Sequence, residues 1–152
     1  MKVVFLDYDG VVNTPMWDRE GHIDYNHPSN GKVNNYQAIM WLNELLCKTG
    51  ASIVVTSTWR FCCHKDKTYQ DCLYNAGLKE KYKILGCTPV FGYSMRRKDE
   101  IEQYLNDHPE IDNFVILDDE YVYDGHLVQC DPYYGFGYRE CIRAIEILNG
   151  NS

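Results

Sequence analysis

The chain has 152 residues, 45% hydrophobic and 24% charged, an ordinary globular composition that excludes a disordered chain, a collagen or a coiled coil. Because domains usually hold about 100–200 residues, the length predicts a single domain over residues 1–152. The 15 basic and 22 acidic residues give a net charge of −7, which excludes bulk attraction of nucleic-acid phosphates but leaves room for a local basic patch.

No run approaches the roughly 18 apolar residues of a membrane-spanning helix, so no membrane partner is expected. The seven cysteines form no CxxC pair and suit a reducing compartment, so a cytoplasmic location is expected. Cys62, Cys63 and His64 are adjacent, but adjacent side chains seldom converge on one ion, and buried or unused thiols are favoured over a metal site there. The composition does not specify an oligomeric state.

In chain order, the hydrophobic pattern predicts strands that alternate with helices. The predicted elements are a strand at 2–6, a loop or flap at 13–31, a helix at 32–48, a strand at 52–55, a helix at 68–75, a strand at 82–85, a helix at 98–106, strands at 113–117 and 127–130, and a helix at 138–148. Gly50 and Gly77 stand where the first two helices should end. This alternation is typical of an α/β fold with a mainly parallel sheet and helices on both faces.

Such sheets bind ligands at the carboxyl ends of their strands, so the residues directly after each strand are the candidate site residues. Acids, hydroxyls and cations gather there. They are Asp7 and Asp9 after the first strand, Thr56 and Ser57 after the second, Asp118 and Asp119 after the strand at 113–117, and Arg96, Arg97 and Lys98 near the start of the helix that precedes that strand.

Four carboxylates at one rim repel one another, so their arrangement requires a compensating cation. Carboxylate oxygens suit a hard divalent ion, and Mg²⁺ is the usual ion beside phosphate. Hydroxyl and Lys/Arg groups donate hydrogen bonds to phosphate oxygens. A lone Asp after a strand most often caps a turn, but Asp-x-Asp-Gly followed by a later Asp-Asp favours phosphoryl transfer.

Asp7-Tyr-Asp9-Gly-Val-Val, then Thr56, Lys98 and Asp118-Asp119, resemble in this order the four motifs of the haloacid dehalogenase (HAD) superfamily of phosphatases. The segments 5–13, 53–60 and 114–119 look most like the small HAD domains of Swiss Army Knife RNA-repair proteins. The resemblance covers residues 2–148. It implies a HAD-like Rossmannoid three-layer sandwich.

The resemblance also implies roles for individual residues. Asp7 would be the nucleophile that forms an aspartyl phosphate, and Asp9 the general acid for the leaving alcohol and then the base for water. Asp118, with Asp7 and the backbone carbonyl of Asp9, would hold Mg²⁺, and Asp119 would complete the metal shell. Thr56 would bind the phosphate.

The cation that neutralises the phosphate could be Arg96, Arg97 or Lys98, and helical spacing favours Lys98 slightly, since a helix turns by about 100° per residue. Ser57 and Arg60 either add phosphate contacts, or cap a helix and form a surface ion pair.

Several aromatic residues have two interpretations. Trp17 and Trp59 could stack on a base or ring of the substrate, although packing in the core or flap is favoured. Tyr133 and Tyr134 either line the rim of the site near Asp131 or form the entry to the last helix.

The gaps between the motifs are filled by the flap at 13–31 and the predicted elements, so no large cap domain is expected. A site without a cap suits a phosphorylated substrate that is large, such as a nucleic-acid end or a phosphoprotein, or a small molecule such as a nucleotide. A second subunit could also supply a lid.

The sequence therefore favours a Mg²⁺-dependent phosphomonoester hydrolase, with two competing functions. A phospho-acceptor signalling module also gathers acids, a Thr or Ser and a Lys, but its acid pair follows the first strand, whereas Asp118-Asp119 come late in this chain. A catalytically silent phosphate-binding module would share the fold, and the complete motif set argues against it.

Overall fold

The computed structural model describes residues 1–17, 32–61, 69–89, 96–122 and 125–150. Its centre is a five-stranded sheet in the order β3-β2-β1-β4-β5, in which every neighbouring pair is parallel. The strands are β1 (Lys2–Leu6), β2 (Ser52–Val55), β3 (Ile84–Cys87), β4 (Asn113–Asp118) and β5 (Leu127–Gln129). The helices are α1 (Tyr36–Thr49), α2 (Tyr69–Asn75), α3 (Arg97–Asp107) and α4 (Tyr138–Leu148), with short 3₁₀ turns η1 (Pro15–Trp17) and η2 (Thr58–Phe61).

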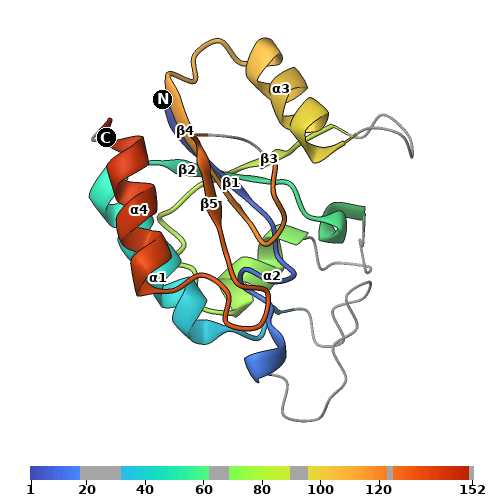
Figure 1. The fold of residues 1–152 in the computed structure, drawn as a ribbon, viewed down its shortest axis with the longest axis vertical. Helices are drawn as coiled ribbons and strands as arrows, with labels where there is room; N and C mark the ends of the chain where they lie inside the picture. Colours follow the sequence, from blue (N-terminus) through green and yellow to red (C-terminus); the bar gives the residue numbers. More distant parts are fainter. Residues whose placement is uncertain (18–31, 62–68, 90–95, 123–124, 151–152) are drawn as a thin grey trace.

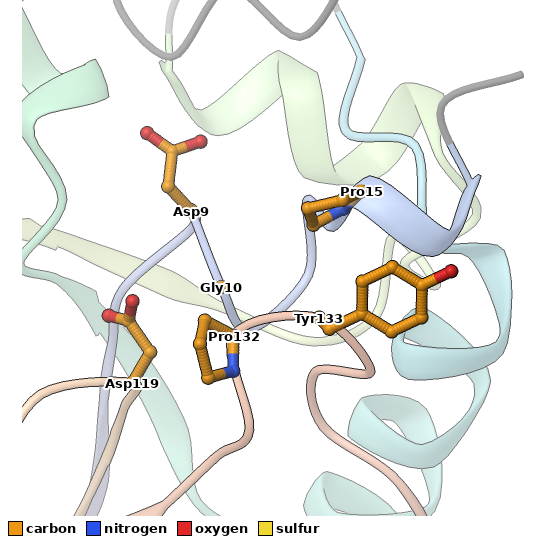
Figure 2. Close-up of a pocket in the computed structure, with 6 residues that line it drawn as sticks. All are labelled: Asp9, Gly10, Pro15, Asp119, Pro132 and Tyr133. Carbon is orange, nitrogen blue, oxygen red and sulfur yellow. The ribbon is translucent and has the colours of Figure 1, made fainter. Parts of the chain in front are cut away.

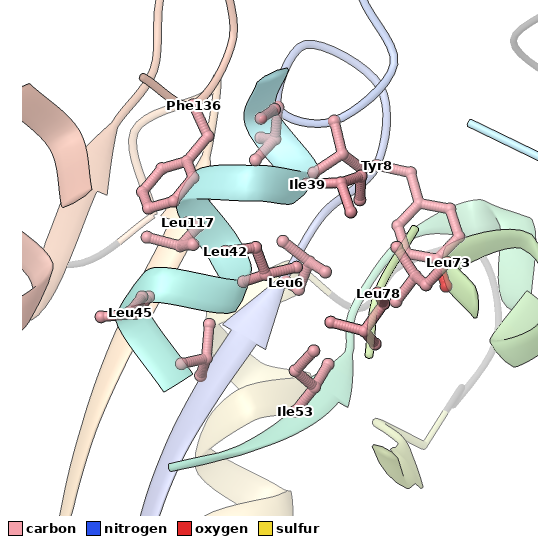
Figure 3. Close-up of a cluster of buried hydrophobic side chains, with 14 of the residues drawn as sticks. Leu6, Tyr8, Ile39, Leu42, Leu45, Ile53, Leu73, Leu78, Leu117 and Phe136 are labelled. Carbon is pink, nitrogen blue, oxygen red and sulfur yellow. The ribbon is translucent and has the colours of Figure 1, made fainter. Parts of the chain in front are cut away.

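Helices cover both faces of the sheet, and this makes three layers (Figure 1). Side chains alternate along β1, so Val4 and Leu6 join the core under α1, α2 and α4, whereas Val3 and Phe5 join a smaller core under α3. The larger core brings together residues from all parts of the chain (Figure 3). The predicted α/β fold, a Rossmannoid three-layer sandwich with a parallel sheet, is confirmed.

The largest differences from the predicted element boundaries concern the first helix and the third strand, and a smaller one at the start of the third helix affects the site. The first helix begins at Tyr36 because the Asn35 side chain accepts a hydrogen bond from the Ala38 N–H at 3.0 Å and so caps the helix there. The third strand begins at Ile84, since the Tyr82 N–H donates to the Lys79 carbonyl in a turn. The third helix begins one residue earlier, at Arg97, and this shift matters for the site.

Gly50 ends α1 in the left-handed conformation, with φ of 70°, as predicted. Among the described residues, no helix has the length and the apolar composition that a membrane crossing requires. The greater part of the predicted flap at 13–31, as well as Cys62, Cys63 and His64, lies outside the described residues. Among the described residues, the segments between the strands contain no helix other than those named above.

Candidate active site

The pairing of β1 with its two neighbours sets the positions of the first candidate residues. Leu6 pairs with Val55 of β2 and with Leu117 of β4. The ladder continues past the strand ends, because the Asp7 N–H donates to the Leu117 carbonyl at 3.0 Å and the Thr56 N–H donates to the Leu6 carbonyl at 2.9 Å. Asp7, Thr56 and Asp118 are thereby fixed side by side at one edge of the sheet.

Three carboxylates converge at this edge. Asp7, Asp118 and Asp119 each offer an oxygen, and the three oxygens lie within 4.8 Å of one another. Asp118 is fully buried and Asp7 is 7% exposed, so water screens this cluster poorly. An all-oxygen donor set of this kind fits a hard divalent cation.

The electrostatics of the three acids also favour a bound cation. The pKa of Asp7 is raised to about 7 by burial in the first place, and by Asp118 and Asp119, although Arg97 opposes the rise. Burial and the neighbouring Asp118 raise the pKa of Asp119 to about 6. Within the described residues, one cation, Arg97, forms ion pairs with these acids. A bound divalent ion would restore their ionised forms.

The turn after Asp7 brings the backbone close to the third carboxylate. Gly10 has φ of +81°, and a Cβ at this position would lie 2.6 Å from the Asp119 carboxyl group. The turn is closed by the N–H groups of Val11, Val12 and Asn13, which all donate to the Tyr8 carbonyl. Glycine therefore satisfies two conditions at once, since both the positive φ and the close approach exclude a side chain.

Arg97 is the cation that reaches the acids. Its Nη1 lies 2.7 Å from Asp118 Oδ2 and 3.1 Å from Asp7 Oδ1. Burial lowers the pKa of Arg97, but the carboxylates of Asp7 and Asp118 outweigh burial and hold the pKa above its ordinary value. Arg97 therefore remains charged within the cluster.

The structure brings Arg97, and not the favoured Lys98, into contact with the acids. Lys98 Nζ lies 3.9 Å from Glu102 Oε1, and the lysine side chain is about half exposed. The buried face of α3 is formed by Glu100, Ile101 and Tyr104, and Arg97 lies three and four residues before the first two of these. Helical geometry thus turns Arg97 toward the sheet and Lys98 toward solvent. Arg96, which is largely exposed, pairs with Asp99.

Thr56 and Ser57 differ although both are fully buried. The Thr56 hydroxyl has no hydrogen-bond partner within the part of the chain that the structure describes. A buried hydroxyl of this kind is costly, and a phosphate oxygen would satisfy it. The Ser57 hydroxyl instead accepts a hydrogen bond from the Trp59 N–H at 3.2 Å, so it caps η2, as the capping interpretation proposed.

Arg60 lies behind the site and belongs to a buried network. Its guanidinium donates to the carbonyls of Thr56 and Ser57 and to the Glu100 carboxylate. The expected surface ion pair is therefore a buried one, and the geometry does not direct Arg60 toward the acids. Burial lowers the pKa of Arg60, while Glu100 opposes the shift. The pair ties the loop after β2 to the helix that carries Arg97.

Asp9 is held apart from the three converging acids. Trp59 Nε1 lies 3.1 Å from each Asp9 oxygen, and Asn13 Nδ2 lies 3.1 Å from Oδ1. Trp59 is 2% exposed and its ring meets the Tyr8 ring edge-on at 5.3 Å, so the favoured packing interpretation is right. In Figure 2, Asp9 and Asp119 lie on opposite sides of Gly10. Asp9 is thus positioned beside the cluster and not within it.

Residues 3–141 match the family model described as the HAD domain in Swiss Army Knife RNA repair proteins. The chain belongs to this HAD family. Membership indicates a HAD-type hydrolase. The chain matches no curated protein and no solved structure.

A cavity of about 270 Å³ adjoins the acids of this HAD domain. Its lining residues are Asp9, Gly10, Pro15, Asp119, Pro132 and Tyr133 (Figure 2). Tyr133 therefore lies at the rim of the cavity, as one of the two interpretations of the Tyr133-Tyr134 pair proposed, and the same segment leads into α4, which begins at Tyr138.

Sequence reasoning missed two contacts of the HAD site, and each had a detectable signal. A tryptophan predicted to be buried needs an acceptor for its N–H, and Asp9 is that acceptor for Trp59. A buried arginine needs a carboxylate, and Glu100 lies on the buried face of α3. Neither partner could be chosen from sequence alone, since both lie far along the chain from the residue they bind.

Proposed function

We propose that this protein is a Mg²⁺-dependent phosphomonoester hydrolase that acts through an aspartyl-phosphate intermediate. The observation that carries the proposal is the position of Asp7, which lies beside Asp118 and Asp119 and forms an ion pair with Arg97. Family membership supports the same function. So does the Thr56 hydroxyl, which has no hydrogen-bond partner among the described residues.

Asp7, Asp118 and Asp119 would hold Mg²⁺, together with the backbone carbonyl of Asp9. The ion supplies positive charge, which neutralises the phosphoryl group and keeps the carboxylates ionised. Arg97 and the Thr56 hydroxyl would bind the remaining phosphate oxygens, because both present donors at the same edge of the sheet.

In the first step, an Asp7 oxygen attacks phosphorus, the bond from phosphorus to the leaving oxygen breaks, and the leaving oxygen takes a proton from the Asp9 carboxyl group. In the second step, a water oxygen attacks phosphorus while the Asp9 carboxylate accepts its proton. The bond from phosphorus to the Asp7 oxygen then breaks. Inorganic phosphate leaves, and both acids regain their starting states.

We further propose that the substrate is a phosphorylated nucleic-acid end. The support is the family description, which names RNA repair proteins, and the presence at the acids of one partly buried arginine among the described residues, which suits one terminal phosphate better than a long anionic backbone. A small phosphorylated molecule is the alternative.

The test of the reaction is the hydrolysis of p-nitrophenyl phosphate with and without Mg²⁺, by the wild type, Asp7→Asn and the matched surface variant Lys98→Met. We expect metal-dependent turnover that Asp7→Asn lowers by at least about 10³-fold, since the nucleophile is lost. A stable, stoichiometric phosphoprotein would identify a phospho-acceptor module instead. No turnover on a panel of phosphate esters would leave a silent binding module.

The test of the substrate compares oligonucleotides phosphorylated at the 3′ or the 5′ end with a mononucleotide and a sugar phosphate. A higher kcat/KM for one of the oligonucleotides supports the nucleic-acid end. Equal or lower values for the oligonucleotides would contradict it and leave the hydrolase intact.

A further inference from the structure

The cavity beside Asp9 is lined by two chemically different kinds of side chain. Asp9 and Asp119 are acids, whereas Pro15, Pro132 and Tyr133 contribute rings. Figure 2 shows the Tyr133 ring and Pro15 on the side away from Asp119, with Pro132 between Asp119 and Tyr133. The cavity therefore joins the proposed general acid to a lining that holds three ring side chains.

Pro132 and Tyr133 belong to a tight turn that begins at Asp131. The Asp131 side chain accepts a hydrogen bond from the Tyr133 N–H at 2.8 Å, and the Asp131 carbonyl accepts one from the Gly135 N–H at 2.7 Å. The Asn35 side chain donates to the Tyr134 carbonyl at 3.1 Å. The Tyr134 ring meets the Tyr133 ring edge-on at 5.0 Å. These contacts orient Tyr133 before any substrate binds.

The same turn packs directly on the turn that carries Asp9. The Phe136 N–H donates to the Val11 carbonyl at 2.8 Å, and a Cβ on Gly135 would lie 2.4 Å from that carbonyl. Gly135, with φ of +75°, permits this close contact. Backbone contacts thus hold the turn that carries Tyr133 against the turn that carries the proposed general acid.

The lining of the cavity suits the leaving group better than the phosphate. No lysine, arginine or histidine lines the cavity among the described residues, so the lining offers a phosphate no cationic side chain. Proline and tyrosine rings instead offer flat apolar surfaces on which a planar ring can stack. The volume of about 270 Å³ lies just below the range of about 300–1,000 Å³ for drug-sized ligands, which suits one ring-bearing unit.

We propose that this cavity is a leaving-group subsite in which one planar ring of the substrate, such as a nucleobase, stacks against Tyr133 between Pro15 and Pro132. The inference rests on the proposed function, because Asp9 identifies this side of the site as the leaving-group side only if Asp9 protonates the leaving oxygen.

The test measures selectivity between ring-bearing and ring-free phosphates. The substrates are adenosine 5′-phosphate, p-nitrophenyl phosphate and glycerol phosphate, and the variants are Tyr133→Ala, Tyr133→Phe and the control Tyr138→Ala, an exposed tyrosine on α4 that does not line the cavity. Stacking of one base is worth about 5-fold or more in affinity. We expect Tyr133→Ala to lower the kcat/KM ratio of ring-bearing to ring-free substrate by about 5-fold, mostly through KM.

The Tyr133→Phe variant keeps the ring and should keep this ratio within about twofold, as should the Tyr138→Ala control, since neither removes the stacking surface. A loss with adenosine 5′-phosphate alone identifies the nucleobase as the bound ring, whereas a loss with both substrates identifies any planar ring. A ratio that Tyr133→Ala leaves unchanged, in an active enzyme, overturns the subsite alone. Absence of all turnover in the wild type overturns the hydrolase and the subsite together.

Discussion

On one side of Asp7, the site consists of side chains that follow buried strands; on the other, it consists of turns that pack on one another. Asp118 and Thr56 belong to the first side, where parallel pairing fixes neighbouring residues in register. Asp9 and Tyr133 belong to the second, where a few hydrogen bonds position the turns. The positions of Asp118 and Thr56 therefore depend on the whole sheet, whereas the positions of Asp9 and Tyr133 depend on few residues. Such a division suits one reaction on varied substrates.

We expect the largest loss of activity from a change at Arg97, which contacts the acids at the strand ends. Replacing Arg97 with methionine removes the donor that contacts both Asp7 and Asp118, and we expect kcat/KM for p-nitrophenyl phosphate to fall by about 100-fold or more. Arg97→Lys should recover part of the loss, since it restores the charge but not the planar donor group. Steady-state kinetics measures both.

The matched control for this prediction is Lys98→Met. Lys98 pairs with Glu102 on the exposed side of α3, so its loss should change kcat/KM by less than about threefold. The reverse order, with Lys98→Met the more damaging variant, would contradict the assignment of the cation to Arg97 and would return Lys98 to the phosphate.

We expect a smaller loss of activity, which depends on the leaving group, from a change at Trp59, the partner of Asp9. The Trp59→Phe variant keeps a ring against Tyr8 but removes the N–H that holds Asp9. A misplaced acid matters most when the leaving group is poor, so kcat/KM should fall about tenfold more for phenyl phosphate than for p-nitrophenyl phosphate. Both substrates carry a ring, and stacking therefore cancels in the comparison.

Trp41→Phe is the control for Trp59→Phe, because Trp41 lies on α1 against Tyr138, away from the acids. It removes the same atoms and should affect both substrates equally. An equal loss for the two leaving groups in Trp59→Phe would instead reduce Trp59 to a packing residue.

The smallest predicted effect concerns stability without metal. The folded pKa values of about 7 for Asp7 and about 6 for Asp119 lie above the ordinary value of 3.8, so the folded state holds protons that the unfolded state has released. This contribution is complete below about pH 4 and is lost as the pH rises through about 7. The Tm of the metal-free protein should therefore fall by a few °C between about pH 5 and pH 8.

Mg²⁺ should reverse that loss, because it binds the ionised carboxylates. Thermal melts with and without millimolar Mg²⁺ should show a larger gain in Tm at about pH 8 than at about pH 5. The Asp119→Asn variant should show a smaller gain at the higher pH. Equal gains at both pH values would argue against a metal site built from these acids.

Much of the fold could be predicted because short β-branched runs specify buried strands. The strands at 2–6 and 52–55 have the predicted bounds, and the acids directly after the strands meet as expected from parallel pairing. The start of α1 was missed, since its hydrophobic pattern begins before the Asn35 cap. The third strand was misplaced because it is an edge strand with an irregular register beside Ile53.

The site could be predicted only where a motif follows a strand. The choice between Arg97 and Lys98 depends on which side of the helix faces the sheet, because adjacent helical residues point about 100° apart. The buried pair of Arg60 and Glu100 and the contact from Trp59 to Asp9 depend on which loops meet across the sheet. The spacing of residues along the sequence does not show which of these segments come into contact.

The central place of β1 has a consequence for the synthesis of the chain. The strand that precedes Asp7 pairs with β2 and with β4, and β4 is made only after most of the sheet. A growing chain that folds from its N-terminus would leave one edge of β1 unpaired, and Asp7 without Asp118, until β4 has left the ribosome. The cluster of three acids would then assemble late. We expect incomplete chains to be inactive, and prone to pair through the exposed edge of β1.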